Sequence, residues 1–462
     1  MTTPSLTILG GGLCGLYAAH QALELGARVS LFEKEAVFGG LAAGHQFEGN
    51  WFDLGVHMLH AFDQEVFATC QVAMGEERLE VPLKAHIKWG GTLYHYPLRG
   101  RDILAGIPPL TLARCLTGLV LAELESRMRR RPLGDDAETA LIDLYGSPLY
   151  EFFFEDFTHR YWGIHPRDLS AEFVRRKMPR LSAIDVFKNL LEKLRLAKPR
   201  DATEGALRFE TLHYSRTGSE TLPRRLAQSL IDRGAKLQGE SPIERIHHNG
   251  STITGVTLAN AQHRQSEAGA HRLEASSSTR YLSTLPLPLL VRQLDPPPPE
   301  PVLAAAEKLR FKPMTVYALL VNQEKCMDAL YTYYRDRIFH RVGEPKNAGL
   351  EVTPKGHTTL IVETTCEVDD PKWQGDAFSQ ILADLQAENL CPPEAVVYHH
   401  LIHSHHAYPI FSLGFEQHLA TVQEYLARFD NLQSTGRQGS FSYPNMHSAM
   451  RMGATAAAEL LS

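Results

Sequence analysis

The sequence predicts an α/β protein in which a dinucleotide-binding domain is interrupted by an inserted mixed α+β domain. A strand, a glycine-rich turn, a helix and a second strand follow one another between Ser5 and Phe32, which is the βαβ unit of a Rossmann-like fold. Longer amphipathic stretches, typical of helices, occupy residues 60–200, and strand-like alternation returns near Ser219. The length of 462 residues also exceeds what one ordinary core accommodates.

Patterns further along the chain predict how the two domains are interleaved. Apolar runs on either side of Gly250 indicate a hairpin, and Thr315–Val321 and Thr358–Thr364 are typical of buried strands in a second sheet. The run Asp295–Pro299 is a stiff connector that suits a crossing between domains. We expect a nucleotide-binding domain of residues 1–60, 215–290 and 420–462, and a substrate domain of residues 61–214 and 291–419.

The glycine-rich turn has the spacing Gly10-x-Gly12-x-x-Gly15. Gly10 permits the tight turn, Gly12 lets a pyrophosphate approach the backbone, and Gly15 lets helix and strand pack closely. The N-terminus of the helix then faces the phosphates. Glu33 ends the second strand about 20 residues further on, where a carboxylate accepts hydrogen bonds from ribose hydroxyls. Together these residues predict a dinucleotide site.

A second glycine pair, Gly39 and Gly40, follows Glu33 closely. The loop after the second strand must run beside an FAD molecule, and glycine lets the backbone come that close. This pair separates FAD proteins from simple nicotinamide dehydrogenases, so we expect non-covalent FAD on a domain of the GR2 type. The other cofactor contacts that we expect adjoin these motifs or begin the hairpin: Lys34, Leu41 and Ile243.

The N-terminal motifs resemble a known superfamily. The stretch GGGLCGLYAAHQALELGARVSLFEKEAVFGGLA is similar to the N-terminal signature of the amine-oxidase and protoporphyrinogen-oxidase superfamily. In that superfamily these residues bind the ADP half of FAD, so the resemblance implies the same role here.

Three further passages resemble UDP-galactopyranose mutases. FDLGVHMLH (Phe52 to His60) resembles their GPHIFH signature, which implies that His57 and His60 lie at the flavin. LYEFFFEDFTHRYWGIHPRDLSAEF (Leu149 to Phe173) resembles their substrate-cleft segment and places Trp162 in the cleft. GRQGSFSY resembles their GRxxxYxY segment, which implies flavin contacts for Gly436, Arg437 and nearby Met446, and a diphosphate contact for Tyr443.

The chain departs from the mutase pattern in specific places. Asn445-Met446-His447 stands where the mutases have Asp-Met-Asp, and Phe441 lacks the hydroxyl of their first tyrosine. The segment LSTLPLPLLVRQL (Leu282 to Leu294) is more similar to the oxidase branch.

These departures leave three functions open. The first is action on a nucleotide-linked sugar through the reduced flavin, with NAD(P)H as a transient reductant. The second is an oxidoreductase of the amine-oxidase or protoporphyrinogen-oxidase type, which transfers a hydride from an organic substrate to oxygen or another acceptor. The third is a catalytically silent flavin-binding scaffold.

Composition argues against one class of partner and indicates the state of the cysteines. The net charge of −6 argues against nucleic-acid binding, which needs a basic surface. Six scattered cysteines without a CxxC pair indicate reduced thiols in a cytoplasmic protein. His399, His400, His403, His405 and His406 form a cluster without a cysteine or acid at ligand spacing. We interpret it as a cleft wall or solvated strand, with no metal site expected.

The stretch from Leu110 to Leu124 is apolar but is broken by Arg114 and Glu123, and arginines follow it at 127 and 129–131. It is too short and too charged to span a bilayer. An amphipathic helix is the simple interpretation, and a peripheral membrane contact through the same helix is the alternative. The sequence is also compatible with a homodimer.

Overall fold

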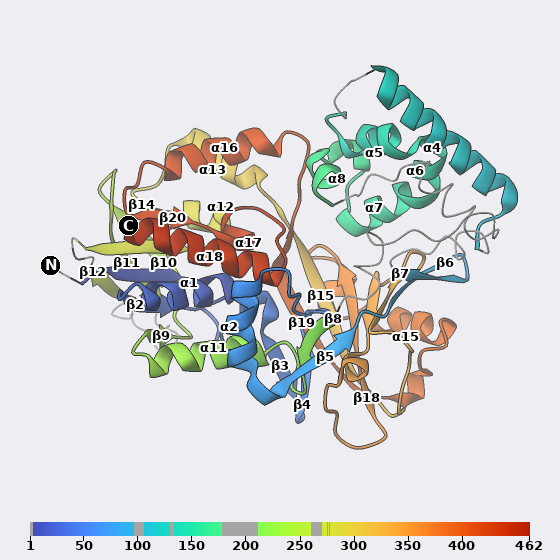
Figure 1. The fold of residues 1–462 in the computed structure, drawn as a ribbon, viewed down its shortest axis with the longest axis horizontal. Coiled ribbons are helices and arrows are strands. Elements are labelled where there is room, and N and C mark those ends of the chain that lie inside the picture. The colour runs from blue at the N-terminus through green and yellow to red at the C-terminus, as the bar shows by residue number, and fades with distance from the viewer. Residues whose placement is uncertain are drawn as a thin grey trace.

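The computed structural model describes residues 3–96, 106–129, 134–177, 211–259, 270–274, 276 and 278–462 (Figure 1). A five-stranded sheet forms the base of the nucleotide-binding part, and its strands run in the order β20-β13-β1-β2-β9. All neighbouring strands in it pair in parallel. Their bounds are β1 (Ser5–Leu9), β2 (Arg28–Phe32), β9 (Lys236–Gln238), β13 (Thr279–Ser283) and β20 (Leu432–Ser434).

Both faces of this sheet are covered. Leu6 and Ile8 of β1 join a core cluster with helices α1, α11 and α18, whereas Leu9 joins a cluster with a second, four-stranded sheet. This alternation along β1 is the strand period of two. The covering elements are α1 (Leu13–Glu24), α11 (Thr221–Asp232), α18 (Met446–Leu461), β10 (Ile243–His248), β11 (Ile253–Ala259), β12 (Ala270–Glu274) and β14 (Leu294–Asp295).

Glycines let α1 pack closely against β1 on one side and against α18 on the other. A Cβ atom on Gly15 would lie 2.2 Å from the Gly10 carbonyl oxygen and 3.2 Å from Ile8 Cγ2. A Cβ atom on Gly453 of α18 would lie 2.1 Å from the Cys14 carbonyl oxygen. The last helix therefore lies directly against the first one, and the expected role of Gly15 in helix–strand packing fits this geometry.

A seven-stranded sheet forms the substrate part, in the order β19-β15-β18-β17-β16-β6-β7. Every residue of β15 and β18 is buried, as expected from their apolar runs. Strand β14 pairs with β10, and Val302 and Ala306, which follow the proline-rich run, still belong to the same core cluster as Leu9. The chain therefore passes into the larger sheet at β15 rather than at the proline-rich run. The bounds are β6 (Ala85–Trp89), β7 (Thr92–Tyr96), β15 (Phe311–Val321), β16 (Tyr331–Tyr334), β17 (Arg341–Gly343), β18 (Thr358–Thr365) and β19 (Val396–Pro409).

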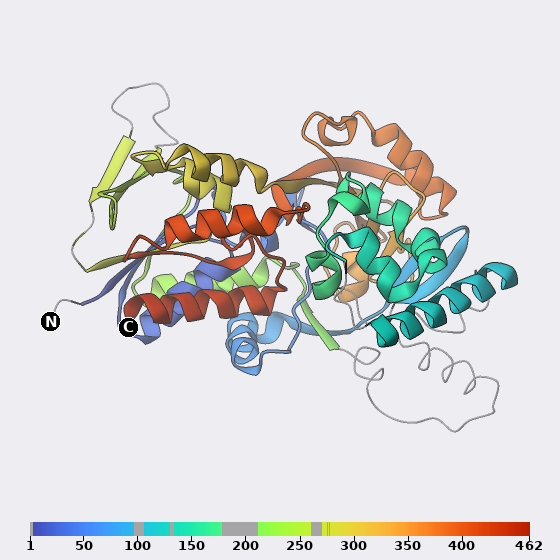
Figure 2. The same cartoon turned by 90° about the horizontal axis from the view of Figure 1, so that it is seen from above.

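A group of helices stands beside this sheet (Figures 1 and 2). Close packing holds it together, since a Cβ atom on Gly118 would lie 2.8 Å from Pro148 Cδ. The helical character expected for residues 60–200 holds for the described residues between 106 and 177, whereas Arg78–Pro82, Ala85–Trp89 and Thr92–Tyr96 form strands. Residues 178–210 lie outside the described part. The helices are α4 (Pro109–Arg129), α5 (Ala137–Tyr145), α6 (Ser147–Phe153), α7 (Glu155–Trp162) and α8 (Glu172–Lys177), with the 3-10 turn η3 (Pro166–Asp168).

The remaining elements connect these layers. They are η1 (Gly40–Ala42), β3 (Gly44–Phe47), β4 (Asn50–Asp53), α2 (Gln64–Met74), η2 (Gly75–Glu77), β5 (Arg78–Pro82), β8 (Thr211–Ser215), α12 (Leu287–Arg292), α13 (Glu300–Lys308), η5 (Pro345–Ala348), α14 (Pro371–Gln374), α15 (Phe378–Ala387), η6 (Pro393–Ala395), α16 (Phe415–Leu426) and α17 (Gly436–Gly439). Among the described helices, none combines the length and apolar character that crossing a bilayer requires.

A buried carboxyl group joins two of these connecting strands. Asp53, at the end of β4, accepts a hydrogen bond from the Tyr214 hydroxyl (2.6 Å) and another from the Ser219 backbone N–H (2.9 Å). Burial raises the pKa of Asp53 to about 6, although both hydrogen bonds oppose the shift. The folded state therefore retains a proton that the unfolded chain releases, and this group lowers stability as pH rises from about 4 to about 6.

We predict that Asp53→Asn gains stability relative to the wild type as pH rises from about 4 to about 7, by on the order of 2–3 kcal/mol. Asparagine keeps the shape of the protonated carboxyl group but has no proton to lose. Denaturant unfolding at both pH values measures the gap. Asp63→Asn is the matched control, because Arg451 lowers the pKa of Asp63 to about 2, outside this range. A gap for Asp53→Asn that does not change with pH would contradict the assignment.

Candidate functional site

One cavity of about 1800 Å³ extends from the dinucleotide turn into the substrate part. Gly10 and Glu33 line one end, and Trp89, Tyr94 and Cys115 line the other. A pocket for one small ligand usually measures about 300–1,000 Å³. The cavity therefore has room for a dinucleotide and a substrate together.

The glycine-rich turn forms the floor of one end of the cavity. Gly12 is the N-cap of α1, and a Cβ atom there would meet no atom closer than 3.9 Å. The open space above Gly12 is where a pyrophosphate would approach the N-terminus of α1. Gly39 and Gly40 have positive φ angles of 129° and 58°, and the Gly39 N–H donates to the Gly11 carbonyl oxygen at 2.8 Å. The two glycine motifs thus lie against each other, as an FAD cradle requires.

Glu33 is fixed at the edge of this cradle. Its carboxylate accepts hydrogen bonds from the backbone N–H groups of Gly11 (2.7 Å) and Glu35 (3.1 Å). The side chain is largely buried but lines the cavity. Because each carboxylate oxygen can accept more than one hydrogen bond, Glu33 retains capacity for ribose hydroxyls.

The loop after β4 carries His57 into the cavity wall, and a buried ion pair supports this loop. The Val56 backbone N–H donates to Glu363 Oε1 at 3.1 Å. Arg341 donates to both oxygens of the same carboxylate, at 2.7 Å and 2.6 Å. Burial alone would raise the pKa of Glu363, but Arg341 and His340 hold it at about 2. Glu363 is fully buried, yet it stays ionised because Arg341 and His340 stabilise its negative charge.

His57 itself is partly buried and neutral. Burial, reinforced by the charge of Arg341, lowers its pKa to about 4. Its Nδ1 atom is buried without a hydrogen-bond partner among the described residues. An orphaned polar atom on a cavity wall is costly unless a ligand or water satisfies it. This atom is therefore an observation in favour of a ligand at this part of the cavity.

The C-terminal segment brings Arg437 and Tyr443 to the same cavity. Arg437 donates to the Ala407 carbonyl oxygen, at 2.7 Å and 3.2 Å. Its guanidinium carbon lies 4.1 Å from the centre of the Tyr443 ring and 5.2 Å from that of Tyr408. Backbone carbonyls and rings orient the arginine without cancelling its charge.

Aromatic side chains from three segments meet beside Arg437. Tyr161 and Trp162 end α7, and both rings pack near Tyr408 of β19, at 5.5 Å and 6.3 Å between ring centres. Tyr408 in turn lies 5.4 Å from Tyr443. All four side chains line the cavity. The sequence-predicted Trp162 and Tyr443 are therefore neighbours of one aromatic wall.

The other predicted residues fall into two groups. His60 lines the cavity, with its ring 5.2 Å from Phe62 and 6.1 Å from His447. The cofactor candidates that also line it are Gly10, Gly12, Glu33, Lys34, Gly39, Gly40, Leu41, His57, Ile243, Arg437 and Met446. Gly15 and Gly436 are not among the lining residues. Gly436 instead packs on Cys14, since a Cβ atom there would lie 2.8 Å from the sulfur.

Sequence reasoning missed several lining residues, notably Arg335, Arg341 and Tyr408. Arg335 packs over Trp89, with its guanidinium carbon 4.3 Å from the ring centre. Its Nε atom is buried and has no hydrogen-bond partner within the described part of the chain. None of these residues belongs to a recognisable motif. The order of strands in the seven-stranded sheet brings them to the cavity.

The histidine cluster of β19 forms part of the cavity wall. Of the two interpretations of this cluster, a cleft wall or a solvated strand, this agrees with the first. His403, His405 and His406 line the cavity. His399 stacks on Phe378, and His403 and His405 pack on Trp373, so these three share one face of the strand. Burial lowers the pKa of His406 to about 4.

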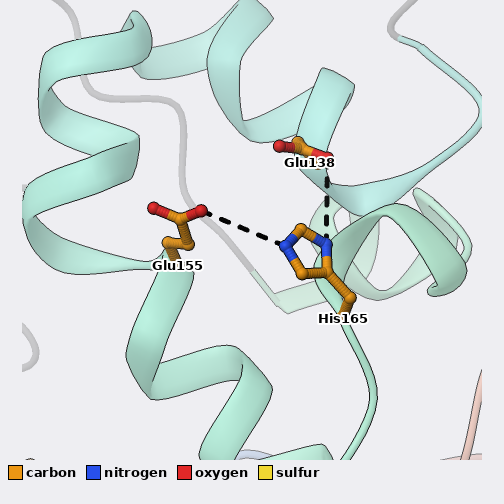
Figure 3. A group of neighbouring side chains, drawn as sticks. All are labelled: Glu138, Glu155 and His165. Carbon is orange, nitrogen blue, oxygen red and sulfur yellow. Dashed lines mark ion pairs between the residues drawn. The ribbon is translucent and has the colours of Figure 1, made fainter.

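A separate polar cluster lies among the helices, outside the cavity lining (Figure 3). His165 lies between two carboxylates, 3.9 Å from Glu138 and 4.0 Å from Glu155, and the three side chains are close enough to share an ion. Arg167 already places a positive charge there, because its Nε lies 3.0 Å from His165 Nδ1 and 3.5 Å from Glu138. We interpret the cluster as an ion-pair network that joins α5, α7 and η3.

Comparison with protein families decides the broad identity. The family of flavin containing amine oxidoreductases matches residues 13–461. The chain belongs to this family. Membership implies a flavin, and the glycine cradle for a dinucleotide fits FAD. The protein is therefore an FAD-dependent enzyme of the amine-oxidase superfamily, as the N-terminal signature indicated.

Solved structures with the same fold include members of several branches. A reduced UDP-galactopyranose mutase has a TM-score of 0.82 at 20% identity, with 99% of this chain and 96% of that chain covered. A protein from Exiguobacterium sp. 255-15, provisionally assigned as a protoporphyrinogen oxidase, has a TM-score of 0.71 at 17% identity, with 100% and 99% covered. Cyclohexylamine oxidase from Brevibacterium oxydans has a TM-score of 0.64 at 16% identity, with 100% and 99% covered. No curated protein sequence matches the chain. At these identities the likeness establishes the fold.

We predict that Gly12→Ala and Gly15→Ala separate FAD binding from folding. The Cβ of Gly12→Ala would project into open space, so the apoprotein should melt like the wild type while FAD affinity falls by about tenfold or more. Gly15→Ala should destabilise the apoprotein itself, because overpacking costs about 1–3 kcal/mol. Thermal melts and titration of flavin fluorescence measure the two effects. Wild-type FAD affinity in Gly12→Ala would be incompatible with this cradle.

We predict that His57→Ala alters the absorption spectrum or reduction potential of the bound flavin but leaves FAD content largely unchanged. The neutral imidazole lines the cavity, whereas the contacts to the ADP half lie elsewhere. Because the pKa of His57 is about 4, the wild-type spectrum should not titrate through this group near pH 6.5. His399→Ala, outside the cavity lining, is the matched control. An unchanged spectrum, potential and activity would remove His57 from the flavin site.

Proposed function

We propose that this flavoenzyme acts on a nucleotide-linked sugar through the reduced flavin, in the manner of a UDP-galactopyranose mutase. The observation that carries the proposal is the distribution of charge along the cavity. Arginines at 335, 341 and 437 line its substrate part. The carboxylates among the described lining residues are Glu33 and Glu35, which lie at the dinucleotide end. An anionic substrate suits such a wall better than a cationic amine does.

The three arginines contribute unequally. Glu363 neutralises Arg341 in a bidentate pair. Arg437 has carbonyl and aromatic partners, so it keeps a net positive charge. Arg335 lies on Trp89, and the negative charges of Asp156 and Asp336 partly offset its own. Guanidinium groups bind phosphate oxygens with paired, charge-assisted hydrogen bonds. A diphosphate would therefore be held by Arg437 and the neighbouring hydroxyls of Tyr443 and Tyr408.

The remaining residues would orient the reactants. The Gly12 turn and Glu33 would hold the ADP half of FAD, with Lys34, Leu41, Ile243 and Met446 along its path. His57 would meet the flavin as a neutral group, so it adds a polar contact without adding charge. A bound, reduced flavin would supply the electron pair for the reaction. NAD(P)H would serve as a transient reductant that docks in the substrate part, because Gly10-x-Gly12-x-x-Gly15 is the single motif of its kind in the sequence.

A second function is favoured by another observation. Ile107, Leu112, Leu116 and Leu119 line the end of the cavity beneath α4, and an apolar wall suits an apolar organic substrate. Under this alternative the enzyme removes a hydride from such a substrate and passes the electrons to oxygen or another acceptor. Membership of the family of flavin containing amine oxidoreductases is equally consistent with this second function.

The two functions predict opposite behaviour of the flavin. For the mutase-like function, turnover of a nucleotide sugar requires prior reduction, by dithionite or NADPH, and leaves the flavin reduced. For the oxidoreductase, a substrate itself bleaches the oxidised flavin under anaerobic conditions. Stopped-flow absorbance with panels of nucleotide sugars and amines distinguishes them. Turnover by the oxidised enzyme with stoichiometric hydrogen peroxide release would exclude the mutase-like function.

We further predict that Arg437→Gln raises the KM for a nucleotide sugar by about tenfold to a hundredfold, because one or more charge-assisted hydrogen bonds to the diphosphate are lost. FAD content is measured in parallel, since Arg437 also lies near the expected flavin. Arg428→Gln is the matched control, because Arg428 packs on Tyr425 and does not line the cavity. An unchanged KM would contradict a diphosphate at Arg437.

A further inference from the structure

Helix α4 (Pro109–Arg129) presents an apolar face to solvent. Among the described residues, five of the fifteen exposed large apolar side chains lie on this one helix. Four of these five side chains form one stripe: Leu110 (77% exposed), Leu121 (55%), Leu124 (49%) and Met128 (74%). Scattered apolar side chains are ordinary on a protein surface, but such a concentration marks an interaction site.

The stripe follows the geometry of a helix. Successive positions along the stripe are separated by seven, four, three and four residues, in the order Leu110, Thr117, Leu121, Leu124 and Met128. These spacings place them on one face. Arg114 adds an exposed basic residue beside the stripe. A solvated helix would instead place polar residues on its outer face.

The inner face of the same helix is already occupied. Cys115 and Leu119 are buried, and the Cys115 thiol lies 3.5 Å from the Pro148 carbonyl oxygen. Leu112, Cys115, Leu116 and Leu119 also line the cavity. The helix runs along the outside of the helical group in both views (Figures 1 and 2). The outer stripe is therefore a second apolar face, which the fold of the described residues does not use.

The charge of this region indicates the occupant. Residues 109–131 contain five arginines (114, 127, 129, 130 and 131) and two glutamates (123 and 125), although the chain as a whole has a net charge of −6. Residues 130 and 131 lie outside the described part, and the structure does not describe the side chains of residues 127 and 129. The contribution of these four arginines is therefore one of sequence alone. A helix that combines an apolar face with excess basic residues suits a surface of anionic lipid headgroups.

We propose that the outer face of α4 docks on an anionic lipid surface, with Leu110, Leu121, Leu124 and Met128 inserted among the acyl chains. This inference concerns a surface and does not depend on the proposed sugar chemistry. Because the inner face of α4 lines the cavity, docking would bring the apolar end of the cavity next to the lipid. The contact is peripheral and reversible, since one amphipathic helix gives limited membrane affinity.

The experiment uses the FAD-loaded, full-length protein and two kinds of vesicle, one containing phosphatidylglycerol in phosphatidylcholine and one of phosphatidylcholine alone. Co-sedimentation should show binding to the anionic vesicles, weaker binding to the neutral ones, and loss of binding at high salt. The affinity of the double variant Leu121→Asp/Leu124→Asp for the anionic vesicles should be lower by about tenfold or more. Both positions are exposed, so the FAD content and melting temperature should stay at wild-type values.

Val72→Asp is the matched control, because Val72 on α2 is 84% exposed and lies on a different helix. It should bind vesicles like the wild type. The proposal is overturned if the wild type ignores anionic vesicles, or if the double variant binds them equally well. Light scattering tests whether a second copy of the chain occupies the stripe instead. A wild-type dimer that dissociates in the Leu121→Asp/Leu124→Asp variant would assign the stripe to this second copy and would also overturn the proposal.

Discussion

The ion pair between Arg341 and Glu363 is the interaction on which the geometry of the site depends. Glu363 is fully buried in β18, yet it accepts hydrogen bonds from Arg341 of β17 and from the backbone of Val56. The loop that carries His57 is thereby anchored to the seven-stranded sheet. This loop follows β4, which pairs with β3 and does not belong to that sheet. Breaking such a pair by removing one partner typically costs about 3–5 kcal/mol, because the other charge stays buried alone. The position of His57 relative to the substrate sheet thus depends on one carboxylate.

The dinucleotide cradle could be predicted almost completely from the sequence. Gly12, Gly15, Glu33 and Gly39 are constrained by local requirements, namely a tight turn, a close helix, a strand end and a backbone near a ligand. Each requirement selects a particular residue type or spacing within a few residues of the sequence. The hairpin at Gly250 and the buried strands β15 and β18 were predictable for the same reason, since hydrophobic periodicity and turn chemistry act over short distances.

The substrate side could be predicted only where a motif resembled a known family, as at Trp162 and Tyr443. Arg335 and Arg341 could not be found, because β16 pairs in parallel with β6, a strand more than 200 residues earlier, and no local pattern records that pairing. Strand β14 likewise lies beside β10 because of tertiary packing, although the prolines after it suggested an earlier crossing. The charge of the cavity, on which the choice between an anionic and an apolar substrate depends, follows from these long-range pairings.

The close contact between α1 and α18 has a consequence for how the protein is made. Gly453 lies against the backbone of Cys14, so the first and last helices of the nucleotide-binding part complete the same layer. During synthesis the cradle residues emerge early, but their packing partner emerges more than 400 residues later. Contacts of such sequence separation form slowly, and domains usually fold as they leave the ribosome. The apolar face of the early segment therefore lacks its partner until the last helix is made, and the layer that supports the cradle is completed late in biosynthesis.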